Sequence, residues 1–191
     1  MIKAAIFGGS FNPIHYGHLI TMQQAAEICA FDKVILIPAF ISPLRRDVSM
    51  VSGEQRLKMI KLAIESDSLF EVSDFEIQKQ GVSYTIETIR EFKKLYNNLS
   101  LIIGYDNYQV FDKWKEPEEI LDLCEVVVLK RKSNSEQVVT HEFADRFKFI
   151  DSPMIEISST MIRERIKYGA DVGYYTPDAV AEYIKRCGLY K

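Results

Sequence analysis

One stretch near the start of the chain, Gly8-Gly9-Ser10-Phe11-Asn12-Pro13-Ile14-His15-Tyr16-Gly17-His18, guides the interpretation of all that follows it. A short apolar run, residues 2–7, precedes this stretch, and apolar residues at helical spacing come after it. A buried strand that leads through glycines into a helix is typical of the first turn of an α/β sheet. Because such turns bind phosphate, the stretch predicts an anion site.

The residue types in this stretch suit an anion. Gly8 and Gly9 have no Cβ, so their N–H groups can approach a phosphate closely. The first N–H groups of the following helix favour an anion as well. His15 and His18 are three residues apart and can point to one side if the helix begins near them. Two imidazoles beside an anion site indicate phosphoryl or nucleotidyl transfer.

Each part of the stretch also has a simpler explanation. A glycine pair after a strand is common, and a single histidine at a helix start more often packs or caps than reacts. The H-x-x-H spacing could also hold zinc, although no third ligand lies nearby in the sequence. Two glycines, two histidines and Pro13 together favour the site. The pattern is neither G-x-G-x-x-G nor G-x-x-x-x-G-K-[ST], so dehydrogenases and P-loop kinases are disfavoured.

Beyond this stretch, helical and strand patterns alternate. Apolar spacing predicts helices over residues 18–30, 85–96, 117–123, 159–168 and 179–187, and another after a capping box of Ser52 and Gln55. Apolar runs predict strands over residues 34–38, 70–77, 99–103 and 126–129, with short strands or extended pieces at 147–150 and 154–157. We expect these side chains to face inward: Leu57, Ile60, Ile64, Ile86, Ile89 and Leu95. Thr176 is expected to cap the last helix.

This alternation predicts one α/β domain over residues 1–191 with a doubly wound, mostly parallel sheet. Residues from about 158 to 191 are expected to form a small C-terminal helical subdomain. In such sheets ligands bind beyond the carboxyl ends of the strands. Four groups follow strands directly, and we expect them to converge on one crevice: residues 8–18, Arg45, Gly104 with Asp106, and residues 158–163.

Composition narrows the class of protein. Of the 191 residues, 47% are hydrophobic and 27% charged, which is typical of a globular protein. The net charge of −3 disfavours nucleic-acid binding and suits small anionic substrates. Cys29, Cys124 and Cys187 form no C-x-x-C pair, so we expect reduced thiols. The sequence indicates neither a signal peptide nor an apolar run of about 20 residues, so a cytoplasmic location is expected.

Two segments carry a specific family resemblance. The first stretch resembles the G-G-[ST]-F-D-P-x-H-x-G-H signature of the nucleotidyltransferase superfamily with the [HT]-x-G-H motif. Ile157-Ser158-Ser159-Thr160-Met161-Ile162-Arg163 resembles its second signature, I-S-S-T-x-I-R. Within this superfamily the chain is most similar to bacterial nicotinate-nucleotide adenylyltransferases, because segments 81–85, 103–106, 113–114 and 183–190 also match in order. The resemblance implies a Rossmann-like nucleotidyltransferase fold over nearly the whole chain.

The resemblance implies adenylyl transfer from ATP to nicotinate mononucleotide in NAD biosynthesis, giving nicotinate adenine dinucleotide and pyrophosphate. We expect His18 to donate to the α-phosphate, His15 to hold phosphates, and Arg163 with Ser159 or Thr160 to bind pyrophosphate. The expected ATP and phosphate contacts are Gly8, Gly9, Ser10, Phe11, Ser158, Ser159 and Thr160. Mg²⁺ would accompany ATP, with no protein ligand cluster visible. The implied partners are small-molecule nucleotides, and a homo-oligomer stays open.

The mononucleotide contacts also follow from the resemblance. It implies that Trp114 stacks on the pyridine ring and that the backbone of Tyr84 and Thr85 contacts the ring carboxylate. Asp106 is expected to bind ribose hydroxyls, with Gly104 beside it, and Arg45 to supply positive charge. From the residues alone, Trp114 could equally be core and Asp106 a helix cap.

Departures from the family pattern leave alternatives open. Ser10 and Asn12 replace the usual Thr and Asp, and the loop 38–45 lacks the usual Asn and His. The choice between nicotinate and nicotinamide is therefore open, although a positive loop favours the nicotinate carboxylate. The alternatives are an adenylyltransferase for nicotinamide mononucleotide or phosphopantetheine, a small cytidylyltransferase, and a nucleotide sensor without catalysis.

Overall fold

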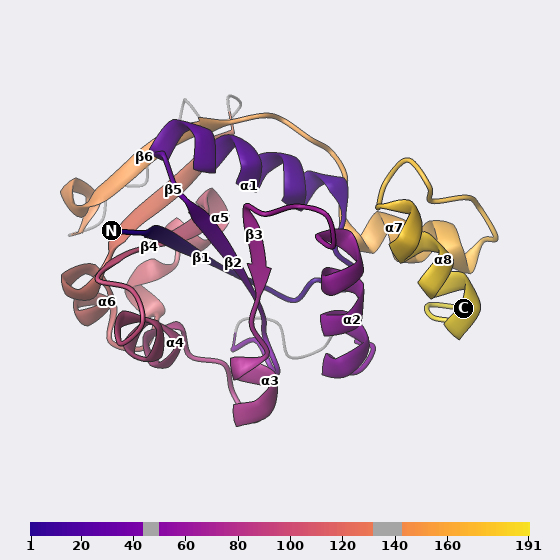
Figure 1. Cartoon of the computed structure of the whole chain (residues 1–191), viewed down its shortest axis with the longest axis horizontal. Helices are drawn as coiled ribbons and strands as arrows, with labels where there is room; N and C mark the ends of the chain where they lie inside the picture. The colour runs from indigo at the N-terminus through magenta and orange to yellow at the C-terminus, as the bar shows by residue number, and fades with distance from the viewer. Residues whose placement is uncertain (44–49, 132–142) are drawn as a thin grey trace.

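The computed structural model describes residues 1–43, 50–131 and 143–191, and one parallel sheet organises them (Figure 1). Its strand order is β3-β2-β1-β4-β5-β6. All pairs of neighbouring strands are parallel, which confirms the predicted doubly wound α/β class. The strands are β1 (Lys3–Gly9), β2 (Lys33–Pro38), β3 (Phe70–Val72), β4 (Asn98–Gly104), β5 (Glu125–Arg131) and β6 (Phe147–Ser152).

Helices cover both faces of the sheet. They are α1 (Tyr16–Cys29), α2 (Gly53–Ala63), α3 (Phe75–Lys79), α4 (Thr85–Lys93), α5 (Tyr105–Tyr108), α6 (Pro117–Leu123), α7 (Ser159–Lys167) and α8 (Asp178–Cys187). Short 3₁₀ turns lie at Phe111–Lys113 and Ala144–Arg146. In Figure 1, α7 and α8 lie beyond α2, at the end of the molecule farthest from α6.

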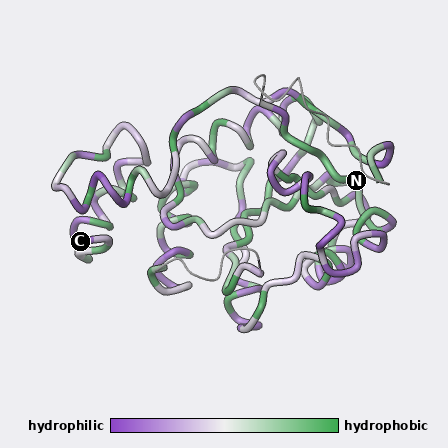
Figure 2. Tube along the Cα trace, turned by 180° about the vertical axis from the view of Figure 1, so that it is seen from behind, coloured by the Kyte–Doolittle hydropathy of each residue, from purple (hydrophilic) through white to green (hydrophobic). Residues whose placement is uncertain are grey.

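Successive residues of the buried strands point to opposite faces and pack into two cores. On β2, Val34 and Leu36 join α1 and α2 in one core, while Ile35 and Ile37 join α4 and α6 in the other. The trace in Figure 2 shows the result, with apolar residues along the central strands. Strands buried on both faces explain the near-continuous apolar runs in the sequence.

The order of the strands creates the position for a site. The chain runs from β1 outward through β2 to β3, and then returns to the other side of β1 with β4. The carboxyl ends of β1 and β4 therefore lie at the point where the direction of winding reverses, which is where open α/β sheets bind ligands. Gly8, Gly9 and Gly104 occupy these two strand ends.

Some predicted boundaries were wrong. The expected strand over residues 70–77 ends at Val72, because the Ser73 hydroxyl accepts from Phe75 N at 3.2 Å and α3 begins there. Residues 154–157 form no strand. Thr176 does not cap α8, because its buried hydroxyl donates to Ile14 O at 2.8 Å.

Two expected inward side chains were also misplaced. Leu95 lies beyond the end of α4 and is exposed, while Phe92 packs inward instead. On α2, Leu57 is half-buried and Arg56 takes a fully buried position. The predicted capping box of Ser52 and Gln55 is confirmed, with both reciprocal hydrogen bonds present. Among the described residues, no helix is both long and apolar enough to cross a bilayer.

Candidate active site

A cavity of about 690 Å³ lies at the carboxyl ends of β1 and β4. It is lined by fourteen of the sixteen residues that the sequence singles out: Gly8, Gly9, Ser10, His15, His18, Tyr84, Thr85, Gly104, Asp106, Trp114, Ser158, Ser159, Thr160 and Arg163. Arg45 falls outside the described residues. Segments more than 140 residues apart in the sequence therefore share one cavity.

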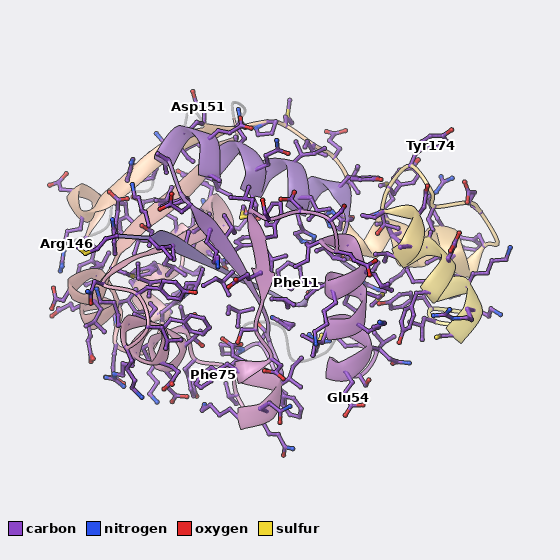
Figure 3. The ribbon with its side chains drawn as sticks, viewed as in Figure 1. Phe11, Glu54, Phe75, Arg146, Asp151 and Tyr174 are labelled. Carbon is purple, nitrogen blue, oxygen red and sulfur yellow. The ribbon has the colours of Figure 1, made fainter. Side chains whose placement is uncertain are left out.

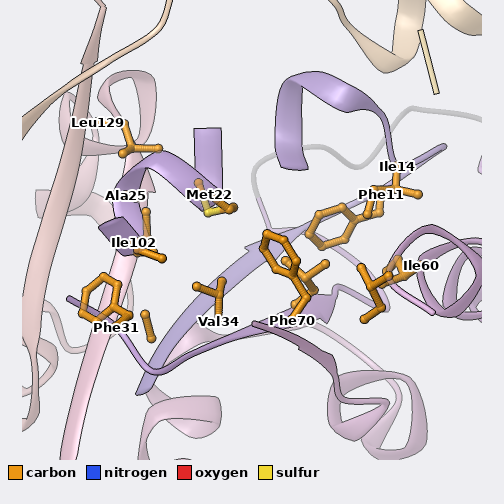
Figure 4. Close-up of a cluster of buried hydrophobic side chains, with 14 of the residues drawn as sticks. Phe11, Ile14, Met22, Ala25, Phe31, Val34, Ile60, Phe70, Ile102 and Leu129 are labelled. Carbon is orange, nitrogen blue, oxygen red and sulfur yellow. The ribbon is translucent and has the colours of Figure 1, made fainter. Parts of the chain in front are cut away.

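Phe11, the sixteenth residue, has its side chain in the core. Its ring packs beside Ile14, Ile60 and Phe70 and has no exposed surface (Figure 4). In Figure 3 it lies in the middle of the molecule, whereas Tyr174 points away from the far end. Phe11 has a left-handed backbone, with φ at 46°, which non-glycine residues rarely adopt outside turns and functional sites. Only its backbone N–H remains as a group for a ligand.

The two imidazoles form a stacked pair at the start of α1. Their centroids are 3.7 Å apart with an interplanar angle of 24°, and the His18 ring also meets the edge of Phe11 at 5.1 Å. Burial lowers the pKa of His15 to about 4, and burial with the neighbouring His15 lowers the pKa of His18 well below 6.5. Both rings are therefore neutral at pH 7 in the free protein, each with one N–H donor.

Buried Nδ1 atoms of both histidines have no hydrogen-bond partner within the described part of the chain. Buried polar atoms without a partner are rare and often belong to sites that await a ligand. Gly17 is required by this arrangement, because a Cβ there would lie 2.9 Å from His15 Nδ1. The glycine between the histidines thus makes room for the stack.

Side chains from the C-terminal segment hold the carbonyls of the first loop. Asn12 O accepts from Arg163 Nη1 at 2.9 Å, and Pro13 O accepts from the Ser159 hydroxyl at 2.8 Å. The Tyr190 hydroxyl donates to Asn12 Oδ1 at 2.8 Å. The carbonyls thus face the C-terminal segment, which fixes the orientation of the loop relative to α7.

The N–H groups of the same loop are open. Those of Ser10 and Phe11 have no acceptor among residues 1–43, 50–131 and 143–191. Gly8 has open space around its Cα, since nothing lies within 4 Å of an added Cβ. Free N–H groups in a turn before a helix form an anion site.

Hydroxyls at the start of α7 differ in what they can offer. Ser158 Oγ accepts from Met161 N at 3.1 Å, and Thr160 Oγ1 accepts from Arg163 Nη2 at 3.1 Å. Both therefore keep their own hydrogen for a phosphate oxygen. Ser159 already donates its hydrogen to Pro13 O, so in this structure its hydroxyl holds the first loop and has no hydrogen left for a phosphate.

A second group of residues lines the α4 side of the cavity. Tyr84 precedes α4 and Thr85 begins it, so the unpaired N–H groups of this helix start adjoin the cavity. Trp114 packs on Phe111 with centroids 5.1 Å apart, and its buried Nε1 has no partner within the described chain. Asp106 lies in the first turn of α5, directly after β4. An aromatic ring, a helix start and a carboxylate suit a nucleotide with a flat, polar base.

Comparisons with known proteins agree with this geometry. Residues 6–165 match a family model described as Cytidylyltransferase-like. A relative from Hydrogenobaculum sp. (strain Y04AAS1) is 40% identical over 187 residues, covering 97% of each chain. One from Caldicellulosiruptor saccharolyticus is 40% identical over 196 residues, covering 100% of each chain. Both are named "Probable nicotinate-nucleotide adenylyltransferase". This chain belongs to the nicotinate-nucleotide adenylyltransferase family.

A solved structure shares the fold. Plasmodium falciparum nicotinic acid mononucleotide adenylyltransferase complexed with NaAD superposes with a TM-score of 0.78, covering 100% of this chain and 98% of that one at 20% identity. The resemblance inferred from the two sequence motifs is confirmed by the relatives, and the fold by this neighbour. Like the other members of the nicotinate-nucleotide adenylyltransferase family, this chain is an enzyme.

Several cavity residues of this family member were not anticipated from its sequence. Glu76 on α3 and Thr88 on α4 are buried and share a hydrogen bond of 2.6 Å at the cavity wall. Lys113 and Lys115 also line it, and Lys115 Nζ lies 4.5 Å from the centre of the Tyr84 ring. Glu76 and Thr88 lie on different helices, and nothing in the sequence around either residue indicates their contact. Lys113 belongs to the matched segment 113–114 but was given no role there, and Lys115 lies directly after that segment.

Nucleotidyltransferases of this kind generally use a divalent metal ion. Among the described residues of this family member, no three His, Cys, Asp or Glu side chains come together as a metal site. The stacked imidazoles do not alter this, because a third ligand is missing.

Proposed function

We propose that this enzyme transfers the adenylyl group of ATP to nicotinate mononucleotide. A phosphate oxygen of the mononucleotide attacks the α-phosphorus, the bond from that phosphorus to the bridging α,β-oxygen breaks, and pyrophosphate leaves. The products are nicotinate adenine dinucleotide and pyrophosphate. The observation that supports this most is the single cavity shared by the imidazole pair, the start of α7 and the Tyr84–Trp114 wall.

The attacking group needs no protein base. A phosphate monoester has its second pKa near 6, so it is largely ionised at pH 7. Catalysis then depends on alignment and on stabilising the charge that builds up on the transferred phosphoryl group. The half-buried His18 donates an N–H to the α-phosphate, and His15 stacks on it and holds its ring. Because both rings are neutral, they act as hydrogen-bond donors that need no reorganisation.

The leaving pyrophosphate is assigned to the start of α7. Two of the five N–H groups of Arg163 hold Asn12 O and Thr160 Oγ1, and three remain for phosphate oxygens. The hydroxyls of Ser158 and Thr160 can donate beside it. The positive end of the α7 dipole adds to this set. The N–H groups of Ser10 and Phe11, which have no acceptor among the described residues, complete the phosphate site beside Gly8 and Gly9.

Nicotinate is favoured over nicotinamide on the α4 side. The start of α4 at Tyr84 and Thr85 presents N–H donors, which suit a carboxylate. Lys113 adds positive charge at the same wall, where Lys115 is ion-paired with Glu87 at 2.9 Å and the buried Glu76 accepts a hydrogen bond from Thr88. Trp114 is assigned to stack on the pyridine ring, and Asp106 with Gly104 to bind the ribose.

We also propose that Mg²⁺ enters with ATP and that the enzyme works in the cytoplasm. Mg²⁺ prefers phosphate and water oxygens over a protein cage, which agrees with the lack of a carboxylate cluster in the described chain. The ion supplies charge neutralisation of the triphosphate when bound. The two buried thiols, Cys29 and Cys124, agree with a reducing compartment.

A pyrophosphate-release assay tests the proposed reaction. The purified chain is supplied with ATP and Mg²⁺, and with nicotinate mononucleotide, nicotinamide mononucleotide or phosphopantetheine in separate reactions. We expect kcat/KM for nicotinate mononucleotide to exceed that for nicotinamide mononucleotide by about 10-fold or more, as one charge-assisted hydrogen bond provides. Phosphopantetheine is expected to give only background release.

Each other outcome of this assay contradicts the proposal. Preferred turnover of nicotinamide mononucleotide would reverse the assignment of the α4 wall. Turnover of phosphopantetheine would place the enzyme on another branch of the superfamily. If the chain binds ATP but releases no pyrophosphate with any of the three acceptors, the result would support a nucleotide sensor.

A further inference from the structure

Arg56 is a buried cation without a counter-ion in the described part of the chain. It lies on α2 with 2% of its surface exposed, and it forms no ion pair among those residues. Its Nη1 donates to Ser10 O at 2.8 Å and its Nε to Val51 O at 3.3 Å. Burial lowers the pKa of this guanidinium. Buried charges are costly unless something neutralises them, so the position calls for an anion.

The Ser10–Phe11 peptide links Arg56 to the cavity. A trans peptide is planar, so its C=O and N–H point in opposite directions. Because Ser10 O accepts from Arg56, the Phe11 N–H faces away from the guanidinium. This N–H has no acceptor among the described residues, and Ser10 lines the cavity. A cation at the carbonyl end also polarises the peptide and makes its N–H a stronger donor.

We propose that Arg56 is a positioning residue for the triphosphate of ATP. It holds the Ser10–Phe11 peptide by its carbonyl oxygen, on the side away from the cavity, so that the Phe11 N–H points at the phosphates. The negative charge of the bound triphosphate then balances the buried guanidinium through that peptide. This proposal rests on the proposed function, because it assumes that ATP is the ligand of the loop.

A purely structural role makes different predictions. Arg56 also connects α2 to residue 51, and a neutral donor could make the same hydrogen bonds. If holding these carbonyls were its whole role, thermal stability would change but ATP affinity would not depend on the charge. If the charge matters, affinity for ATP follows the charge of residue 56, while affinity for the mononucleotide does not.

Calorimetric titration of three variants with ATP in the absence of mononucleotide separates the two roles. Arg56→Gln is expected to bind ATP about 10- to 100-fold more weakly than wild type, as loss of a hydrogen bond from a charged donor predicts. Arg56→Lys keeps the charge and should stay within about 5-fold. Nicotinate mononucleotide should bind all of them within about 3-fold of wild type. Arg90→Gln on α4 is the matched control, because it removes one exposed charge far from residue 56.

The outcomes distinguish this inference from the proposed function. If the wild-type chain does not bind ATP, the proposed function fails. If the wild-type chain binds ATP but folded Arg56→Gln binds it as tightly as wild type, or folded Arg56→Lys binds it as weakly as Arg56→Gln, the inference fails. A measurement on wild type guards against unfolded variants: hydrogen exchange at the Phe11 amide should slow when ATP binds. Unchanged exchange at Phe11 in the ATP-bound chain also overturns the proposal.

Discussion

Replacing His18 with alanine is expected to lower kcat for nicotinate adenine dinucleotide formation by about 10²- to 10³-fold, as loss of one preorganised donor does. The imidazole is half-buried, stacked on His15 and in contact with the ring of Phe11, so its orientation is set before substrate arrives. Alanine leaves a space that water enters, and water is a mobile donor. KM for ATP should change far less than kcat, because the interaction strengthens as charge builds up on the α-phosphate.

Steady-state kinetics of two further variants make this test specific. His18→Gln retains an N–H near the position of Nε2, so its kcat should lie between those of wild type and His18→Ala. Gln23→Ala, an exposed change on the same helix, should behave as wild type. If His18→Ala retains activity within a fewfold of wild type, His18 is not the donor described here.

Replacing Arg163 with alanine is expected to lower kcat/KM for ATP by about 10²-fold or more. The guanidinium holds Asn12 O and Thr160 Oγ1 in this structure, and we propose that its remaining N–H groups bind the leaving pyrophosphate. Each hydrogen bond to a charged donor contributes about 1.5–3 kcal/mol, and two are lost together with the charge. Arg163→Lys should recover only part, since an ammonium lacks the planar fork.

Arg165 provides the matched control for Arg163. It lies two positions further along α7, donates to Asp171 O and packs on Tyr175, so it does not line the cavity. Arg165→Ala should leave kcat/KM for ATP within about 3-fold of wild type. If Arg163→Ala and Arg165→Ala show equal losses in the same assay, the effect belongs to the folding of α7 and not to the phosphate site.

The main features of the fold could be predicted because they follow from local signals. Strands buried on both faces, such as 34–38, appear as continuous apolar runs, and capping residues such as Ser52 mark helix starts. The convergence of residues 8–18 with 158–163 was also predicted, because both segments were expected to follow strands of a parallel sheet; in the structure the second follows β6 after a short irregular segment, residues 153–158. Tyr84, Thr85 and Trp114 line the same cavity although they follow no strand, and they were assigned from the family resemblance.

Other features depend on long-range contacts that local patterns do not contain. Arg56 is buried where the apolar spacing on α2 pointed to Leu57, because the loop carbonyls of Ser10 and Val51 need a donor there. Glu76 was placed at the end of a strand that the structure stops at Val72. In each case a tertiary hydrogen bond, to Ser10 O or from Thr88, decides the position.

The C-terminal segment does more than close the fold. Four side chains of this segment donate to residues 12–14 and so set the geometry of the loop before α1: Ser159, Arg163, Thr176 and Tyr190. Sequence comparison alone assigned Arg163 and Ser159 to phosphate binding. The structure adds that they orient the loop before ATP arrives, which is the preorganisation that electrostatic catalysis requires.

A crystal structure of the chain with a non-hydrolysable ATP analogue and Mg²⁺ tests the central claim most directly. The account predicts that the triphosphate lies between residues 8–11 and the start of α7, with His18 in hydrogen-bond contact with the α-phosphate and Arg163 with the γ- or β-phosphate. A triphosphate that contacts only one of these two segments, or that lies outside their shared cavity, would contradict it.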